Sequence, residues 1–215
     1  MTLSKLLTVA AVSAMALATT TANAQISISQ HNFSSYGWSG NEICKPCHTP
    51  HFANETVGRL WNHALTTATY QMHKGTGTAE LNLDNASRMC MSCHDGTVAL
   101  DSFGGASGNG TNMIPTRANI GTNLDDDHPI GSDAIYPTTT STRFNPQTVS
   151  TSGTSSSVTF GGNSLRLKSW VDSTGATKFV VGCTTCHNAH NAGNFPHMTQ
   201  VTNNASTLCL VCHIK

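Results

Sequence analysis

The sequence predicts a mostly irregular fold with short α-helices and one small β-hairpin, in which bound groups fill the interior. Three observations support this expectation. Only 10% of the 215 residues are charged and 6% are aromatic, which is little material for a large side-chain core. The pattern C-x-x-C-H occurs four times and uses all eight cysteines. The stretches between the second and third copies are rich in Gly, Ser and Thr.

The four C-x-x-C-H copies predict covalent haem attachment. In this pattern two thiols add to the vinyl groups of one porphyrin, and the adjacent histidine binds the iron. Zinc sites and disulfides also use C-x-x-C, but neither requires a histidine at the next position in every copy. We therefore predict four covalently attached haem c groups, with iron, and a multihaem cytochrome c fold in which the haems form the core. The attachment cysteines are Cys44, Cys47, Cys90, Cys93, Cys183, Cys186, Cys209 and Cys212, and the proximal iron ligands are His48, His94, His187 and His213.

Residues 1–24 have the pattern of a secretory signal peptide. Lys5 precedes an apolar run from 6 to 17, and Ala22-Asn23-Ala24 forms a small-x-small cleavage site. A membrane anchor is the alternative, but it would need an apolar stretch of about 20 residues. We expect the mature chain to begin at Gln25, to have no membrane span, and to be exported through the periplasm to the cell surface or the extracellular space.

The formal charge of the mature chain gives no support for two classes of partner. Without Lys5, ten Lys and Arg stand against eleven Asp and Glu, so the formal charge is −1. A near-neutral chain gives no indication of binding to nucleic acid or to an anionic membrane.

The motifs form two similar pairs. The copies at 44–51 and 183–190 share the longer form C-x-x-C-H-x-x-H, which indicates a duplication. We expect a single tetrahaem domain over 25–215, made of two two-haem units at about 25–100 and 165–215 that a Gly/Ser/Thr-rich insertion at about 101–164 joins.

The second and fourth motifs follow similar segments. Asn85-Ala86-Ser87 precedes the second motif, and Asn204-Ala205-Ser206 precedes the fourth. Both asparagines are expected to be N-caps of short helices that carry the motifs. Gly96 is expected to end the first of these helices, and the other to run to Lys215.

The insertion and the segment after it carry turn and strand signals. The Gly-rich run at 104–110 predicts a flexible loop, and 138–159 predicts either an exposed loop or a weakly paired surface strand. Two strand-like runs flank the turn Asp172-Ser173-Thr174-Gly175, which predicts a β-hairpin over about 165–181.

Seven of the eleven histidines remain as possible second iron ligands. His51 and His190 lie three residues past a proximal ligand. One helical turn cannot carry a side chain to the opposite face of the same porphyrin, so each should ligate the iron of a neighbouring haem. Duplication suggests one more ligand upstream of each unit, and His31 and His128 occupy those places, with Asp127 or its neighbours available to orient His128. The expected distal set is His31, His51, His128 and His190.

The remaining histidines and the methionines near the motifs are expected to have structural roles. His63, His73 and His197 are expected to pack against haem edges or to bond propionates. Methionine is the competing sixth ligand and would raise the reduction potentials. Because seven histidines are available for four irons, histidine is the better default, and Met89 and Met91 are expected to pack on the porphyrin.

Several segments together resemble a known family. They are His31-Asn32-Phe33-Ser34, Cys44 to His51, Leu60-Trp61-Asn62, Cys90 to Thr97, Asp127-His128-Pro129-Ile130 and Cys183 to His190. With these segments the mature chain resembles the secreted tetrahaem c-type cytochromes, and it is similar to the extracellular cytochrome filament (nanowire) subunits of metal-reducing bacteria. The resemblance implies closely stacked haems with two histidine ligands each, polymerisation of the chain with itself, and one distal ligand that can come from a neighbouring subunit. His31 on the N-terminal arm is then the candidate for that crossing.

The leading functional expectation is electron conduction without catalysis, so no catalytic residue is assigned. The chain would exchange electrons with copies of itself and with other redox proteins or extracellular acceptors. A monomeric periplasmic electron shuttle is the first alternative. A small multihaem reductase is the second, and it would require one iron without a distal ligand and an acid–base residue such as His63 or His73.

Overall fold

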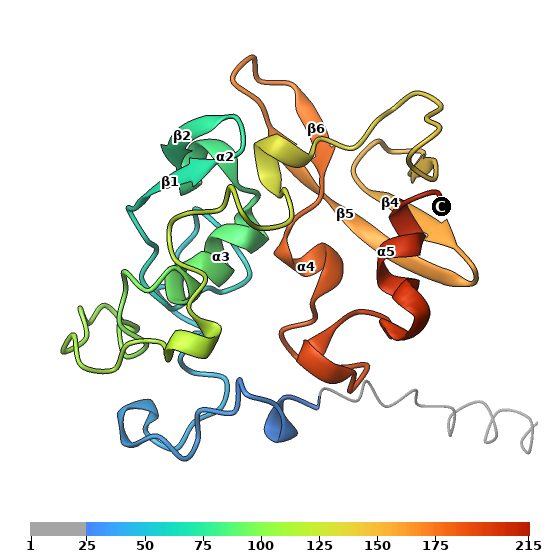
Figure 1. Cartoon of the computed structure of the whole chain (residues 1–215). Helices are drawn as coiled ribbons and strands as arrows, with labels where there is room; N and C mark the ends of the chain where they lie inside the picture. The colour runs from blue at the N-terminus through green and yellow to red at the C-terminus, as the bar shows by residue number, and fades with distance from the viewer. Residues whose placement is uncertain (1–24) are drawn as a thin grey trace, which may run out of the picture.

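The computed structural model describes residues 25–215, and the predicted signal peptide lies outside them (Figure 1). The helices are short: α2 (Ala79–Asn82), α3 (Asn85–His94), α4 (Cys183–Cys186) and α5 (Thr207–Cys212). The 3₁₀ turns are η1 (Ile26–Ile28), η2 (Gly37–Ser39), η3 (Thr116–Ala118), η4 (Gly131–Ala134), η5 (Pro196–Met198) and η6 (Asn204–Ser206). Within 25–215, no helix has the length and apolarity that crossing a membrane requires.

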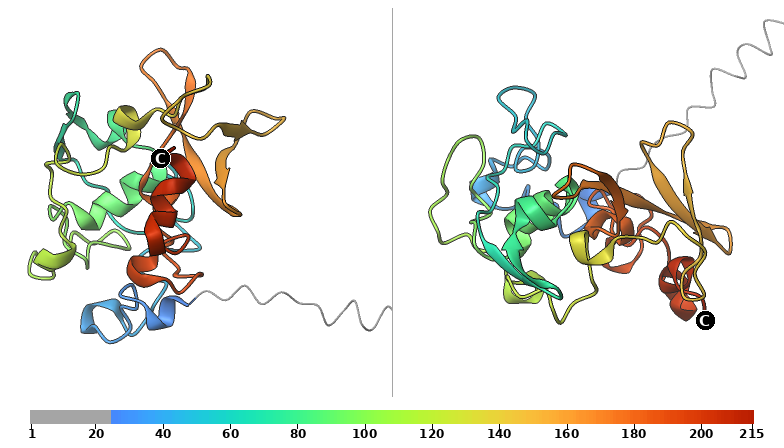
Figure 2. Two further views of the ribbon diagram at one scale, coloured as in Figure 1. Left: turned by 45° about the vertical axis from the view of Figure 1, so that its right-hand side comes forward. Right: turned by 90° about the horizontal axis from the view of Figure 1, so that it is seen from above.

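The strands form two separate antiparallel sheets. The strands are β1 (Thr69–Met72), β2 (Gly75–Thr78), β3 (Gln147–Val149), β4 (Ser156–Phe160), β5 (Asn163–Val171) and β6 (Thr177–Val180). β1 pairs with β2, and the second sheet has the order β3-β4-β5-β6. Figure 2 shows the two sheets on either side of α3 and α4, from two further directions.

Each half of the chain has its own small core. The first core cluster contains Tyr70, Met72, Ala79, Leu83, Met91 and Leu124. The second contains Tyr136, Val158, Leu165, Leu167 and Val211. Met72 and Met91 are 3% and 1% exposed, so both thioethers are packed among side chains of this core. Met91 therefore belongs to the side-chain core rather than to a free surface beside Cys90.

Strand β5 connects the two cores. Alternate residues of a strand point to opposite faces. Leu165 and Leu167 point to one face and pack with Val211 of α5. Trp170 points to the other face, where its indole Nε1 donates a hydrogen bond to the carbonyl of Leu81 at 3.2 Å. The strand therefore has the fourth motif on one side and the segment before the second motif on the other.

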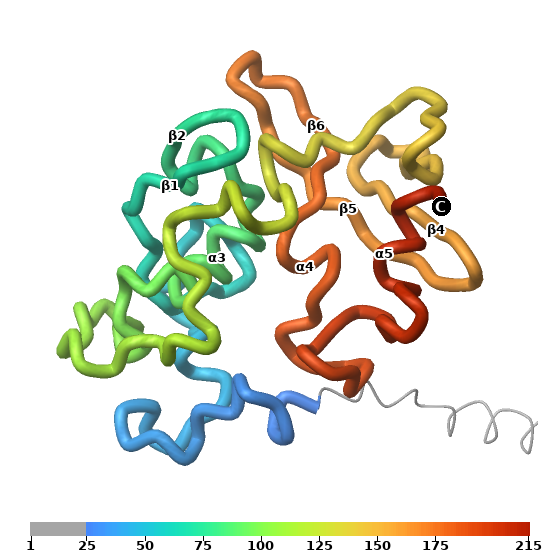
Figure 3. Tube along the Cα trace, in the orientation of Figure 1, coloured from blue at the N-terminus to red at the C-terminus, as the bar shows by residue number. Residues whose placement is uncertain are grey.

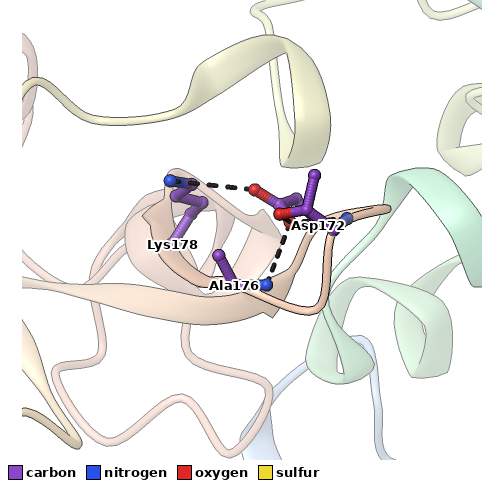
Figure 4. Close-up of polar contacts among 4 residues, drawn as sticks. Asp172, Ala176 and Lys178 are labelled. Carbon is purple, nitrogen blue, oxygen red and sulfur yellow. Dashed lines mark hydrogen bonds and ion pairs between the residues drawn. The ribbon is translucent and has the colours of Figure 1, made fainter.

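The hairpin expected over about 165–181 is present as β5 and β6. Its turn is closed by Asp172, whose carboxylate accepts hydrogen bonds from the backbone N–H groups of Thr174 and Ala176 and lies 3.7 Å from Lys178 Nζ (Figure 4). The hydrogen bond from the Thr174 hydroxyl is the largest cause that lowers the pKa of Asp172, the backbone bonds add to it, and Lys178 contributes less. The segment 138–159 was expected to be a surface loop or a weakly paired strand. It supplies β3 and most of β4, and Val158 of β4 is completely buried in the second core.

The predicted helix cap before the second motif is wrong by one residue. Asp84 is the N-cap of α3: its side chain accepts hydrogen bonds from the N–H groups of Ala86 and Ser87 at 3.0 and 3.2 Å. Asn85 is the first helical residue. Asp and Asn cap equally well, so the sequence alone did not separate them. Gly96 ends the helix as predicted, with a left-handed φ of 72°.

The predicted cap before the fourth motif is also wrong. Asn204 lies in the 3₁₀ turn η6, where Ala205 has a φ of 51°, and α5 begins only at Thr207 without a side-chain cap. The helix stops at Cys212, because His213 is extended with φ −95° and ψ 132°. It therefore does not run to Lys215.

A close contact joins the two halves at α3 and α4. The backbone N–H of Cys183 donates to Ser87 Oγ at 3.0 Å. Gly182 approaches the capping carboxylate so closely that an added Cβ would lie 2.2 Å from Asp84 Oδ2. A side chain at position 182 would therefore separate the third motif from the second.

Candidate functional site

Each of the four motifs forms one helical turn. The backbone N–H of the histidine bonds to the carbonyl of the first cysteine at 2.8 Å in the first motif, 3.0 Å in the third and 2.9 Å in the fourth. The second motif lies within α3. Residues i and i+3 of one turn share a face, so the two thiols of each motif are presented together. None of the eight cysteines is in a disulfide in the described part of the chain.

Thiols of consecutive motifs lie near one another. The side chains of Cys90 and Cys183 are within hydrogen-bonding reach across the contact between α3 and α4. Burial raises the pKa of Cys93, and the thiol of Cys47 adds to this shift. Burial also raises the pKa of Cys186 to about 11, with a further contribution from Cys212. The motifs thus follow one another in space in the order of the sequence.

Three of the four predicted proximal histidines are oriented by main-chain carbonyls. The ring Nδ1 atoms of His48, His94 and His187 lie 2.8, 2.8 and 2.9 Å from carbonyl oxygens. A carbonyl only accepts, so Nδ1 carries the proton and Nε2 keeps its lone pair. The acceptors belong to Arg59, Ala118 and His197. This is the arrangement that metal-binding histidines use to fix the tautomer and the ring orientation.

Two of the predicted distal histidines are oriented in the same way. His31 Nδ1 donates to the carbonyl of Ala189 at 3.1 Å, and His128 Nδ1 donates to the carbonyl of Pro129 at 2.9 Å. The bond to Ala189 brings the N-terminal arm against the chain after α4, as the tube in Figure 3 traces. The carboxylate of Asp127 makes no hydrogen bond to His128, because the Pro129 carbonyl takes that place.

The structure brings three predicted distal histidines opposite three predicted proximal histidines. The ring centroids of His48 and His190 lie 6.1 Å apart, those of His94 and His31 lie 6.1 Å apart, and those of His213 and His128 lie 6.2 Å apart. In each case the two residues come from distant parts of the sequence. The three spacings are nearly identical.

His187 and His51 are the two members of the predicted set left over. Within 25–215, neither ring stacks on or tilts against another aromatic ring, and both side chains are exposed. His51 Nδ1 and Nε2 make no hydrogen bond to the described residues, although the backbone N–H of His51 bonds to Thr49 Oγ1. The structure therefore does not bring these two predicted ligands together.

The other three histidines have contacts of a different kind. His63 is 3% exposed, and its ring nitrogens lie 2.9 and 3.1 Å from the carbonyls of Ala64 and Ala99. Its Nε2 is also 3.6 Å from Cys93 Sγ. His73 Nε2 bonds to the carbonyl of Asp127 at 3.0 Å. His197 acts through its carbonyl, which accepts from His187, rather than through its ring.

A cavity of about 560 Å³ lies beside the first motif. Trp61 and His63 are among its lining residues, and Phe52 and Val98 supply apolar surface. The Trp61 indole is buried, its Nε1–H has no acceptor, and its ring centroid is 6.3 Å from that of His48. An unsatisfied donor beside a cavity with both polar and apolar lining fits a flat apolar group that carries acceptor oxygens, as a porphyrin with propionates does.

The donor set as a whole fits haem better than zinc. Paired thiols on one turn, a following histidine with a free Nε2, and a second imidazole opposite it are the parts of a c-type site with two axial histidines. No group of three or more His, Cys, Asp or Glu in the described part of the chain gathers around a point as a zinc or calcium site does.

The parts of the site that the sequence does not reveal are the main-chain carbonyl groups that accept hydrogen bonds from the histidines. The acceptor carbonyls of Arg59, Ala118, His197 and Ala189 have no residue-type signature, so no motif could have identified them. The positive φ of Arg59, 61°, and of His197, 58°, marks two of these loops as conformationally special, and only the structure displays it.

A family model for the doubled CXXCH motif matches residues 177–215, which contain the third and fourth motifs. The comparison with curated proteins found no match to the chain. The family match indicates a multihaem c-type cytochrome-like protein with covalently bound haem c and points to electron transfer. Proteins of this class are typically exported.

Proposed function

We propose that the chain is a tetrahaem cytochrome that conducts electrons along four haems, each closed by two axial histidines. The observation that carries this proposal is the set of three facing imidazole pairs. Two nitrogen ligands at about 2.0–2.1 Å from one metal ion place the centroids of their rings roughly 6 Å apart. The measured spacings of 6.1, 6.1 and 6.2 Å agree with that estimate.

The assignment follows from these pairs. His48 and His190 would hold the iron of the first motif, His94 and His31 that of the second, and His213 and His128 that of the fourth. His190 then ligates the iron of another motif rather than its own, in line with the expectation from the C-x-x-C-H-x-x-H pattern. Haem iron, when bound, supplies reversible one-electron transfer between ferric and ferrous states.

The contacts between motifs support a continuous chain of sites. Cys47 lies near Cys93, Cys90 near Cys183, and Cys186 near Cys212, so the attachment points of consecutive haems are neighbours. Four sites in sequence order would give one path through the polypeptide. With two histidines at each of the three paired sites, substrates would have no open coordination position there, and the chain would act as a conductor rather than as a catalyst.

The third site leads to the proposal of a polymer. His187 is exposed and lacks an imidazole partner among residues 25–215, and His51 is exposed and lacks a proximal partner. We infer that His51 of one copy ligates the third iron of the next copy, and that the chain is the subunit of an extracellular filament. This replaces His31 as the crossing ligand, because His31 bonds to Ala189 of its own chain and faces His94.

The exposed His187 also favours one alternative. If no neighbouring copy supplies a ligand, the third iron would keep an open position, as a small multihaem reductase requires. A monomeric periplasmic shuttle would need a water or another ligand at the same place. These alternatives differ from the filament in the coordination of one iron, so the same measurements separate all three.

Three measurements on the protein secreted by its host test the proposal. Mass spectrometry of the mature chain is expected to find four haems and a first residue at position 25. Electron microscopy is expected to find filaments. The optical spectrum is expected to be low-spin with no carbon monoxide binding after reduction. Fewer than four haems would contradict the tetrahaem count, and a monomer that binds one carbon monoxide would contradict the filament and support an open third iron.

A further inference from the structure

A recess that the proposed electron path does not use lies on the second sheet, on the face opposite the buried Val158 and Leu165. Its volume is about 320 Å³. The lining residues are Thr148, Ser150, Ser155, Ser156, Ser157, Ser164 and Arg166. Six of these seven carry hydroxyl groups, the seventh is a cation, and none is acidic, apolar or aromatic. The recess lies almost wholly in the Ser/Thr-rich insertion.

Strand register places the cation between hydroxyls. Thr148 pairs with Ser157, and Ser157 pairs with Arg166, so these three residues form one row across β3, β4 and β5. The neighbours Val158 and Leu165 are buried in the second core. Because side chains alternate along a strand, the row points away from the core and into the recess.

Several donors of the recess have no acceptor in the protein. Ser156 Oγ donates to Gln147 Oε1 at 2.6 Å, and Ser164 Oγ accepts from Thr159 Oγ1 at 2.9 Å. The hydroxyls of Thr148, Ser155 and Ser157 make no such bond to the described residues, nor does the guanidinium of Arg166. These groups can therefore all turn toward one bound acceptor.

The recess also lacks a counter-charge. Within 25–215, the one ion pair shorter than 4.0 Å joins Lys178 to Asp172, so no carboxylate neutralises Arg166. Lys168 follows two residues later on the same face of β5. Burial lowers the pKa of Lys168, the carboxylate of Asp84 opposes this shift, and the positive charge of Arg166 adds to it. Asp84 therefore compensates Lys168 in part, whereas Arg166 has no ion-pair partner in the described residues.

We propose that this recess binds an oxyanion group, either as a free inorganic anion or as the acidic group of a polysaccharide. A guanidinium forms two parallel hydrogen bonds to a carboxylate, sulfate or phosphate, and hydroxyl donors complete the shell of such a group. A volume of about 320 Å³ accommodates one oxyanion or one acidic sugar unit. A neutral sugar or an aromatic ligand is less suited, because the recess contains no ring to stack on. The insertion would then anchor the protein to acidic material while the haem sites conduct electrons.

The test is equilibrium binding to the haem-loaded protein at low ionic strength. The probes are sodium sulfate, oligosaccharides of alginate, and neutral dextran as the reference. Arg166→Gln is expected to weaken binding of the preferred probe by at least about tenfold, because it removes charge-assisted hydrogen bonds. Arg166→Lys retains the charge and loses the fork geometry, so an intermediate loss is expected. Lys178→Gln, on β6 of the same sheet, is the matched control and is expected to change affinity less than about twofold.

The sulfate and alginate experiments distinguish the two possible sources of the oxyanion. Sulfate binding that depends on Arg166 supports a free-anion site, and alginate binding without sulfate binding supports a polysaccharide site. If neither sulfate nor alginate binds, the proposal is overturned. Equal losses in Arg166→Gln and Lys178→Gln also overturn it, because they would indicate general charge attraction. Of the two substituted positions Arg166 is exposed and Lys178 is half-buried, and an unchanged optical spectrum checks that each variant is folded. The outcome is independent of the electron-transfer proposal, since no measurement involves electron flow.

Discussion

His48 and His190 face each other with ring centroids 6.1 Å apart, although one belongs to the first motif and the other follows the third. The contact ties the beginning of the chain to its C-terminal third. His31 and Ala189 make a second tie at the same place through a 3.1 Å hydrogen bond. The two halves are therefore joined at this place, because the half after the insertion contributes a predicted ligand, His190, to the site of the first motif.

Replacing His190 by Ala is expected to open one iron. The first-motif haem would lose its second imidazole and change from low-spin to high-spin, while the other haems stay low-spin. The measurement is the optical and electron paramagnetic resonance spectrum of the ferric protein. His73→Ala is the control, because the His73 ring faces no other imidazole in the described residues and bonds to the Asp127 carbonyl. An unchanged low-spin spectrum in His190→Ala would contradict the pairing with His48.

Replacing His51 by Ala is expected to break the polymer. The third iron of each neighbouring copy would lose its ligand, so one high-spin haem and loss of filaments should appear together in electron micrographs and spectra. His31→Ala is the comparison: it should open one iron within the same copy while filaments persist. The reverse pattern, with filaments lost only in His31→Ala, would restore His31 as the crossing ligand.

Replacing Asp84 by Ala is expected to lower the free energy of unfolding by about 1–2 kcal/mol, because two helix N–H groups lose their acceptor. Thermal unfolding of the haem-loaded protein, followed by circular dichroism, measures the change. Asn85→Ala is the control and is expected to have a smaller effect, since Asn85 does not cap the helix. A larger loss in Asn85→Ala would show that the cap is assigned to the wrong residue.

Replacing Gly182 by Ala is expected to destabilise the contact between α3 and α4. The new Cβ would lie 2.2 Å from Asp84 Oδ2 and 2.8 Å from Ser87 Oγ. Overpacking of this kind lowers the free energy of unfolding by about 1–3 kcal/mol. The midpoint of urea unfolding of the haem-loaded protein reports the loss. Gly37→Ala is the matched control, because no atom lies within 4 Å of its added Cβ. Equal midpoints for the two variants would contradict the close approach.

Replacing Leu165 by Ala is expected to lower the free energy of unfolding by about 2–5 kcal/mol, the usual range for truncation of a buried leucine. Leu165 is 1% exposed in the second core, whereas Ser169 on the same strand is exposed and serves as the control position. The measurement is again urea unfolding. A smaller loss of stability in Leu165→Ala than in Ser169→Ala would indicate that the sheet is not part of the stable core.

Local features were predictable from the sequence, and long-range pairing was not. The motif turns and the hairpin around Asp172 depend on neighbouring residues, so their patterns are visible in the sequence. The partner of His190 depends on how two distant segments pack, and spacing from its own motif carries no information about that. The cap at Asp84 was missed because its neighbour Asn85 is an equally good capping residue. The role of the insertion in the core was missed because Val158 is an isolated apolar residue among serines and threonines.

The carbonyl acceptors of His48, His94 and His187 have an evolutionary consequence. Every amino acid supplies the same main-chain oxygen, so the identities of Arg59, Ala118 and His197 can change while the imidazoles keep their orientation. Selection at these positions would act on backbone shape alone. Relatives of this protein can therefore diverge widely in sequence around the predicted ligands and still preserve the orientation of these three imidazoles.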